Sequence, residues 1–294
     1  MNQIRIPEKG KSQLFFITSV NRTAVGSKLS EFVQKKLVEL SLIETTESTL
    51  VFRYKLHHQV MEGSAMIHTW SADMEELQSD LVIITDLNGN CKDIDHFEKL
   101  SQKWEGGFLD EISPKYMDYK EVLQVMAEET SKLLGNKEQF LKTFVGYSTW
   151  RFFFQDWYRI HPTEEDKPLN LTQYFGKVDL PLNIHSVTEK ETENGSPVVI
   201  KNTAVLDKER FDRKTFARML KDLTNVYNID ASLEVDMEER YEFAEDGWLN
   251  EAEMFLQTAV SHWYSISSAH QIKRLSEEEK KELGQYTNEE ITVG

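Results

Sequence analysis

Residues 57–68 bring together several side chains of metal-ligating types. The group consists of His57, His58, Met61, Glu62, Met66 and His68. Imidazole and thioether groups bind transition metals, so a metal site is one interpretation. Successive side chains on a strand point to opposite faces, however, so only one of His57 and His58 could join such a site. We therefore interpret these residues as ordinary strand histidines and predict no metal ion or other cofactor.

Residues 86–90 (Asp-Leu-Asn-Gly-Asn) begin like a calcium-binding loop. An EF-hand loop places glycine at its sixth position and glutamate at its twelfth. Here those positions hold Cys91 and Phe97. The Asn-Gly dipeptide is instead a strong signal for a β-hairpin turn, which is what we predict. Cys91 is the only cysteine in the sequence, so an intramolecular disulfide is excluded, and no nucleophile motif surrounds it.

Carboxylates are abundant, with 50 Asp and Glu among 294 residues. Glycosidase chemistry needs two carboxylates at a defined separation with contrasting pKa values, and the sequence does not single out such a pair. No glycine-rich phosphate loop follows a strand, and no Gly-x-Ser-x-Gly, His-Glu-x-x-His or Cys-x-x-Cys motif occurs. We predict a non-catalytic protein and keep an unrecognised hydrolase as an alternative.

The acids concentrate in residues 234–253, which contain nine acidic side chains and one base, Arg240, and so carry −8 of the chain's net charge of −16. Apolar and acidic residues alternate there, which predicts a β-hairpin strand with one buried and one solvent-facing side. The predicted buried side consists of Leu233, Val235, Met237, Tyr241 and Phe243. Glu239 is the one residue that breaks the alternation. The predicted partner-binding acids are Glu234, Asp236, Glu238, Glu242, Glu245 and Asp246.

The net charge also limits the partners. Binding to a phosphate backbone needs a basic surface, so we predict no nucleic-acid binding, and anionic membrane surfaces are disfavoured for the same reason. A basic protein is the electrostatically natural partner. No run is long and apolar enough for a transmembrane helix, and residues 14–17 are too short for a secretory signal core. We predict a cytoplasmic protein, with the cell envelope as the alternative if a leader has been removed.

Hydrophobic periodicity predicts strands at 13–20, 50–60 and 81–85, followed by helices at 119–134 and from 140 towards 157. Residues 28–43 fit either a helix or a strand. Pro162 and Pro168 indicate a loop or linker. In the C-terminal half, the predicted elements are strands at 173–190 and 197–206 around a Glu193-Asn194-Gly195 turn, a helix at 216–226, and a long run of period two from Trp248 to Leu275.

This order of elements predicts an α+β fold: a large, curved, mostly antiparallel sheet, similar to a half-barrel, partly wrapped around several helices. We predict one domain over residues 1–275, with a helical middle segment at about 119–158, and a charged tail at 276–294. An aromatic cluster lies at the end of the helical segment. On a helix, Trp150, Phe153, Phe154 and Trp157 would share a core face, while Phe152 and Tyr158 would lie elsewhere and could line a pocket.

The long amphipathic strands, the Leu-Asn-Gly-Asn turn at 87–90, the helical middle and the Asp-Gly-Trp-Leu turn at 246–249 resemble a group of uncharacterised β-rich proteins from Bacteroidota. Those proteins often carry a lipoprotein leader, and the resemblance implies an architecture like that of the half-barrel lipoprotein carriers. The resemblance covers most of the chain. It rests on the pattern of elements rather than on a diagnostic motif.

Two binding functions follow. The main prediction is a non-catalytic module whose acidic face docks a basic protein, for example an immunity or adaptor protein of a bacterial toxin or secretion system. Such binding would weaken steeply with salt. The alternative is a carrier of an apolar small molecule or lipid in a half-barrel cavity. The pocket predicted for that alternative is lined by Tyr54, Leu56, Trp248 and Met254.

Overall fold

The computed structural model describes residues 2–63, 65–147, 149–190, 197–226 and 228–282. Within them, eleven strands form one antiparallel sheet. The strands are β2 (Ser12–Val25), β3 (Lys28–Thr45), β4 (Thr49–Glu62), β5 (Asp80–Asp86), β6 (Cys91–Ile94), β8 (Glu164–Leu171), β9 (Leu180–Lys190), β10 (Val198–Leu206), β11 (Glu234–Phe243), β12 (Leu249–Val260) and β13 (Tyr264–Arg274). Two short strands, β1 (Asn2–Gln3) and β7 (Ile160–His161), pair separately. This confirms the predicted α+β class with a large antiparallel sheet, which is open rather than closed into a barrel.

The strand order is β6-β5-β4-β3-β2-β13-β12-β11-β10-β9-β8. Each half of the sheet is a meander, because strands that follow one another in the chain lie side by side. The two halves join at the centre of the sheet, where β2 pairs with β13 along eleven residues of β13. The first and last long strands of the sheet are therefore neighbours.

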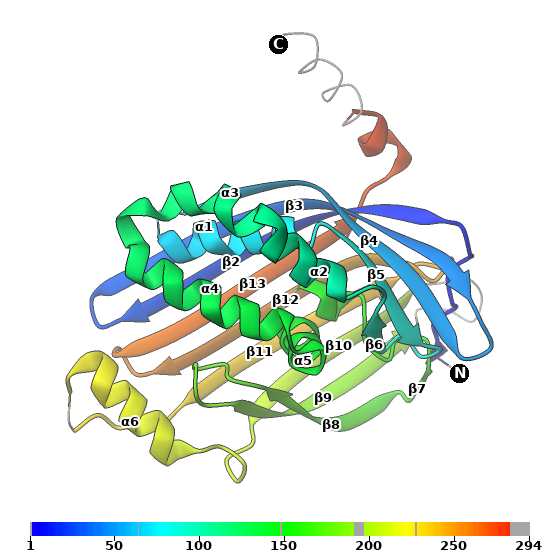
Figure 1. Ribbon diagram of the computed structural model, residues 1–294. Coiled ribbons are helices and arrows are strands. Elements are labelled where there is room, and N and C mark those ends of the chain that lie inside the picture. Colours follow the sequence, from blue (N-terminus) through cyan, green and yellow to red (C-terminus); the bar gives the residue numbers. More distant parts are fainter. Residues whose placement is uncertain (1, 64, 148, 191–196, 227, 283–294) are drawn as a thin grey trace.

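Helices cover one face of this sheet, which we call the inner face (Figure 1). They are α1 (Met66–Leu77), α2 (Glu98–Lys103), the π-helical turn η1 (Trp104–Phe108), α3 (Leu109–Ile112), the 3-10 segment η2 (Ser113–Tyr119), α4 (Lys120–Leu134), α5 (Lys137–Tyr147), the 3-10 turn η3 (Thr149–Phe152) and α6 (Arg213–Thr224). Helices α1 to α5 lie together, while α6 lies apart near the β12–β13 turn (Figure 1). No helix of the described part of the chain is long and apolar enough to cross a membrane.

The buried apolar residues form two separate clusters on the inner face. The larger one joins the helices α1 to α5 and η3 to strands β2 to β6 and to one end of the later strands, and it includes Phe52 and Tyr54. The smaller one packs α6 on the opposite end of β9 to β13 through Phe216 and Leu220. Burial of apolar area is the main stabilising term in each cluster. The strip of sheet between the clusters is where polar residues point inward.

Three predictions about single elements were wrong. In place of the helix predicted from 140 towards 157, helix α5 ends at Tyr147, the separate 3-10 turn η3 ends at Phe152, and turns follow. The aromatic cluster nevertheless lies in the core, and Phe152 and Tyr158 are as buried as the four residues assigned to one helical face. Pro168 lies within strand β8 rather than in a loop. Strand β8 is the edge of the sheet, where proline's missing N–H donor is tolerated.

The third correction concerns the run from Trp248 to Leu275, which is two antiparallel strands rather than one. Ser261 adopts a positive φ of 48° in the turn between β12 and β13, and alternation alone did not reveal this break. Residues 28–43, which fitted a helix or a strand, are strand β3. The predicted Glu193-Asn194-Gly195 turn lies outside the described residues, and β9 and β10 pair on either side of it.

Helix α4 lies where the sequence predicts a helix. Its Val122 and Val125 are 47% and 60% exposed. Leu123, Met126 and Ala127 pack against the larger apolar cluster instead.

Candidate functional site

A row of inward-pointing side chains crosses seven neighbouring strands between the two apolar clusters. In register order, from β9 to β3, it consists of Ser186, Asn202, Glu239, Met254, His270, Ser19 and Gln34. We call this the polar row. The row two residues further along each strand towards the larger cluster contains Ile200, Tyr241, Ala252, Ile272 and Ile17, with Thr188 and Lys36 at its two ends. Six of the seven members of the polar row can form hydrogen bonds, at a depth where the neighbouring rows are mainly apolar.

One end of the polar row is a continuous hydrogen-bonded chain. The Ser186 hydroxyl donates to Asn202 Oδ1 at 2.7 Å, and the Asn202 amide donates to Glu239 Oε2 at 2.8 Å. All three residues are buried. Buried polar groups that lack partners cost free energy, and this chain supplies partners to each of them.

The Glu239 carboxylate also forms an ion pair with Arg151, whose Nη1 lies 2.8 Å from Oε1. Arg151 belongs to η3, so this contact joins the helical cover to the floor of the sheet. The Glu239 side chain is fully buried and that of Arg151 is 9% exposed. Burial alone would lower the pKa of Arg151, but the Glu239 carboxylate together with Tyr241 outweighs burial and raises that pKa. The Arg151 guanidinium is therefore charged in the interior.

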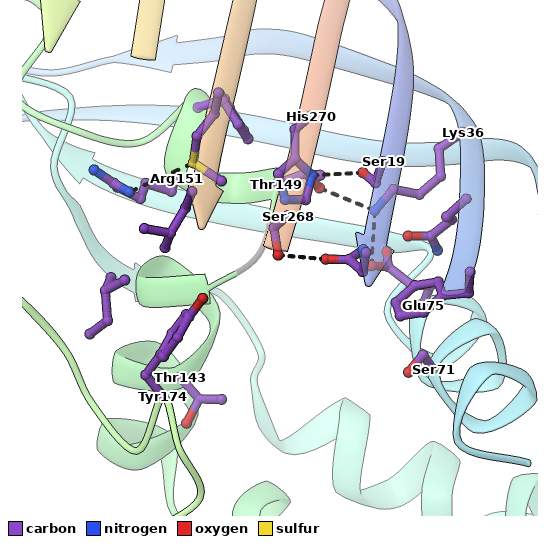
Figure 2. Close-up of a pocket in the computed structure, with 17 residues that line it drawn as sticks. Ser19, Lys36, Ser71, Glu75, Thr143, Thr149, Arg151, Tyr174, Ser268 and His270 are labelled. Atoms are coloured by element: carbon purple, nitrogen blue, oxygen red, sulfur yellow. Dashed lines mark hydrogen bonds and ion pairs between the residues drawn. The ribbon is translucent and has the colours of Figure 1, made fainter. Parts of the chain in front are cut away.

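A second buried cation, Lys36, lies on β3 near the other end of the polar row. It is 1% exposed, and its Nζ donates to Glu75 Oε1 at 2.9 Å and to Thr149 Oγ1 at 3.1 Å. Figure 2 shows these three side chains converging from β3, α1 and η3. The Glu75 side chain is 23% exposed. This ion pair is consequently buried at its cation and open to solvent at its anion.

His270 lies between the two cations and accepts or donates a hydrogen bond at 2.8 Å between Nδ1 and the Ser19 hydroxyl. Its ring lies 5.8 Å from that of Phe152. Burial, followed by the positive charges of Lys36 and Arg151, lowers the pKa of His270 to about 4. His270 is therefore neutral near pH 7 and adds no charge to the site.

These groups line a cavity of about 400 Å³ on the inner face. Its walls combine the polar side chains with apolar ones. The polar and charged lining residues are Ser19, Asn21, Gln34, Lys36, Ser71, Glu75, Thr143, Thr149, Arg151, Tyr174, Ser268 and His270, and the apolar ones are Phe32, Phe152, Leu171, Met254 and Leu256. Figure 2 shows the labelled side chains around this space. The volume falls within the range of small-molecule sites.

The pocket predicted from the sequence overlaps this cavity at one residue. Met254 lines it, next to Arg151, whose Nη1 lies 4.0 Å from the Met254 sulfur. Tyr54, Leu56 and Trp248 are buried in the larger apolar cluster and are not among the cavity's lining residues. The structure does not bring these four residues together as one site.

The acids predicted to bind a partner lie on the opposite, outer side of β11 and in the turn after it. Glu234, Asp236 and Glu238 are exposed on the strand, and Glu245 is exposed in the turn. The other two have partners within the chain: Glu242 accepts from Arg240 at 2.7 Å, and Asp246 pairs with Arg274 at 2.7 Å. The acidic surface therefore exists, with part of its charge neutralised internally.

The residues of the histidine group lie on β4 and α1, and Cys91 lies on β6. A bulge in β4 opposite Leu37 and Val38 leaves both His57 and His58 exposed, while His68 lies on α1 against Phe32. In the described ranges, no three His, Cys, Asp or Glu residues come together as metal ligands. Burial and the nearby Asp93 raise the pKa of the Cys91 thiol to about 12, which disfavours a reactive thiolate.

Comparison with known proteins identifies no family. No family model and no curated protein matches the sequence. Among solved structures, one described for lipid–protein interactions in lipovitellin matches with a TM-score of 0.48 and 9% sequence identity over 92% of this chain. This chain spans 25% of the length of that lipovitellin chain. The site is therefore interpreted from its own residues.

Proposed function

We propose that the protein binds and carries a small amphipathic molecule in the inner-face cavity, without catalysing a reaction on it. The observation that carries the proposal is the composition of the cavity wall. Two buried cations and several hydroxyl and amide groups line the space together with the apolar side chains of Phe32, Phe152, Leu171 and Leu256. A molecule with one polar group and one apolar part matches this wall better than a purely apolar lipid.

The free-energy cost of burying polar and charged side chains on the inner face supports the same proposal. Replacing a buried ion pair with well-packed apolar residues is often neutral or stabilising. Lys36 and Glu239 are charged residues on a sheet face that is mainly filled by apolar side chains, and Arg151 from η3 pairs with Glu239. A binding role accounts for the placement of Lys36 and Arg151 around an open space.

Filling the cavity tests the proposal. Ser268 faces the cavity from β13, while its neighbour Ser267 points to the outer face. Native mass spectrometry of the protein purified from its own cells should show a bound small molecule in the wild type. The Ser268→Trp variant should lose the bound mass, and the matched Ser267→Trp variant should keep it. Absence of any bound mass from the wild type, together with no saturable binding of lauryl-chain amphiphiles, would contradict the proposal.

Docking of a basic partner stays a prediction for the outer face of β11. It concerns a different surface from the cavity, so the two functions are separable by mutation. The exposed Glu234 and Glu238 carry the prediction, because they have no ion-pair partner among the described residues.

A further inference from the structure

Unlike Lys36 and Arg151, Glu75 is held by a single side-chain contact. Its carboxylate accepts a hydrogen bond from Lys36, but its side chain is 23% exposed, and no second polar contact to it is present in the described part of the chain. Lys36, by contrast, is 1% exposed and cannot follow Glu75 into solvent. A rotation of Glu75 towards water would therefore leave a buried ammonium group facing the cavity.

The balance of charges around the cavity indicates the charge of a ligand group that could take the place of the Glu75 carboxylate. Lys36 and Arg151 contribute two positive charges, and Glu75 and Glu239 contribute two negative ones, while His270 is neutral. With Glu75 turned outward, the site has one uncompensated positive charge. A ligand with a single negative charge restores neutrality, whereas a dianion exceeds it and a cation adds to the imbalance.

Hydrogen-bonding geometry narrows the ligand further. Lys36 Nζ already holds a carboxylate oxygen at 2.9 Å, and the Thr149 hydroxyl lies 3.1 Å from the same nitrogen. A second carboxylate can thus occupy the position of the first and accept a hydrogen bond from Lys36 Nζ, with the Thr149 hydroxyl beside it.

We propose that the ligand is an amphiphile with one carboxylate, such as a fatty acid, and that its carboxylate displaces Glu75 from Lys36. Glu75 is then a built-in competitor that occupies the cation while the cavity is empty. This inference rests on the proposed function, because it names the ligand class of the same cavity. It assigns Lys36 as the residue that recognises the ligand's charged group and the apolar wall around Phe32 and Leu256 as the contact surface for its tail.

The test compares laurate with lauryl alcohol, which share a tail and differ in the charged group. Dissociation constants measured by calorimetry below the micellar range should favour laurate by about tenfold in the wild type. Glu75→Gln removes the competitor, so it should tighten laurate binding by about tenfold and leave the alcohol within about twofold. Lys36→Met should weaken laurate to the level of the alcohol, and Lys36→Arg should restore part of the preference.

The exposed Lys35–Glu62 pair on the outer face supplies matched controls. Lys35→Met and Glu62→Gln should leave both dissociation constants unchanged. Circular dichroism and the melting temperature verify that each variant folds. If the alcohol binds as tightly as laurate and Glu75→Gln shifts both equally, the carboxylate inference is wrong while the carrier function stands. If neither compound binds the wild type or the Glu75→Gln variant, the carrier function itself is wrong.

Discussion

The two sides of strand β11 carry acids under opposite conditions. On the outer side, Glu234, Asp236 and Glu238 are exposed, so their carboxylates are solvated by water. On the inner side, Glu239 is fully buried and held by Arg151 and Asn202. The outer acids determine the protein's charge as seen by other molecules. The single inner acid determines how the floor of the sheet is joined to the helical cover, because Arg151 comes from η3.

The comparison teaches that the number of acids in a segment and the importance of each acid are separate properties. Exposed charges interact weakly through water and salt. A buried charge depends on its partner, because removing one member leaves the other without compensation. Three sets of substitutions, taken from the largest expected effect to the smallest, compare the buried polar groups of the inner face with the acids of the outer face.

Glu239→Gln should destabilise the protein by about 3 kcal/mol, because it leaves the Arg151 guanidinium without its counterion in the interior. The Asn202 amide can still donate to the new Gln oxygen, so the lost stability reports on the removed charge rather than on the hydrogen bond. Urea unfolding monitored by circular dichroism measures the change. The double variant Arg151→Met with Glu239→Gln should be less destabilised than the sum of the two single variants. Strict additivity in that cycle would show that the pair is not coupled.

Protonation of His270 should give the next largest effect. Its pKa in the folded protein is about 4, below the ordinary value of 6.5, so the unfolded chain binds the proton at higher pH than the folded one. Stability is therefore complete above pH 6.5 and falls as the pH drops towards 4. Between pH 7 and pH 4 the wild type should lose about 2 kcal/mol more than His270→Gln, whereas the exposed His58→Gln should behave like the wild type. If all three proteins lost the same stability, protonation of His270 would not be the cause of the loss.

Neutralising the outer acids should have the smallest effect on stability. Replacing Glu234, Glu238 and Glu242 with Gln should change the free energy of unfolding by no more than about 1 kcal/mol in total. Ligand binding in the cavity should not change. If a basic protein partner binds the outer face, the same triple variant should weaken that binding and reduce its dependence on salt. An unchanged affinity and salt dependence would exclude this surface as the docking site.

Much of the fold was predictable because alternation reports directly on the two faces of a strand. Strand β11 and the Asn88-Gly89 hairpin were predicted close to their observed bounds. Strand β3 was ambiguous for a reason that the structure explains. Its inward positions are apolar at Val38 and beyond but polar at Gln34 and Lys36, so the site itself disrupts the pattern that identifies a strand.

The site was not predictable from local patterns, because it depends on register between strands that are distant in sequence. Nothing in the local sequence distinguishes Ser19, Asn202 or His270 from the other polar residues of its own strand, and only cross-strand pairing places them in one row. Glu239 was the available signal. It broke the alternation of β11 because it occupies a core position, which marks a buried charge rather than an irregularity in an acidic face.

The pairing of β2 with β13 has a consequence for how the chain folds. It joins residues as distant as Ser19 and His270, which are 251 positions apart. We expect the N-terminal meander to form first and to leave β2 as an exposed edge until β13 has been synthesised, since pairings of such sequence separation form slowly. The pairing of β2 with β13 completes the cavity. A molecule that binds there would shift the population towards the joined sheet, so the ligand would also act as a folding aid that protects an aggregation-prone edge.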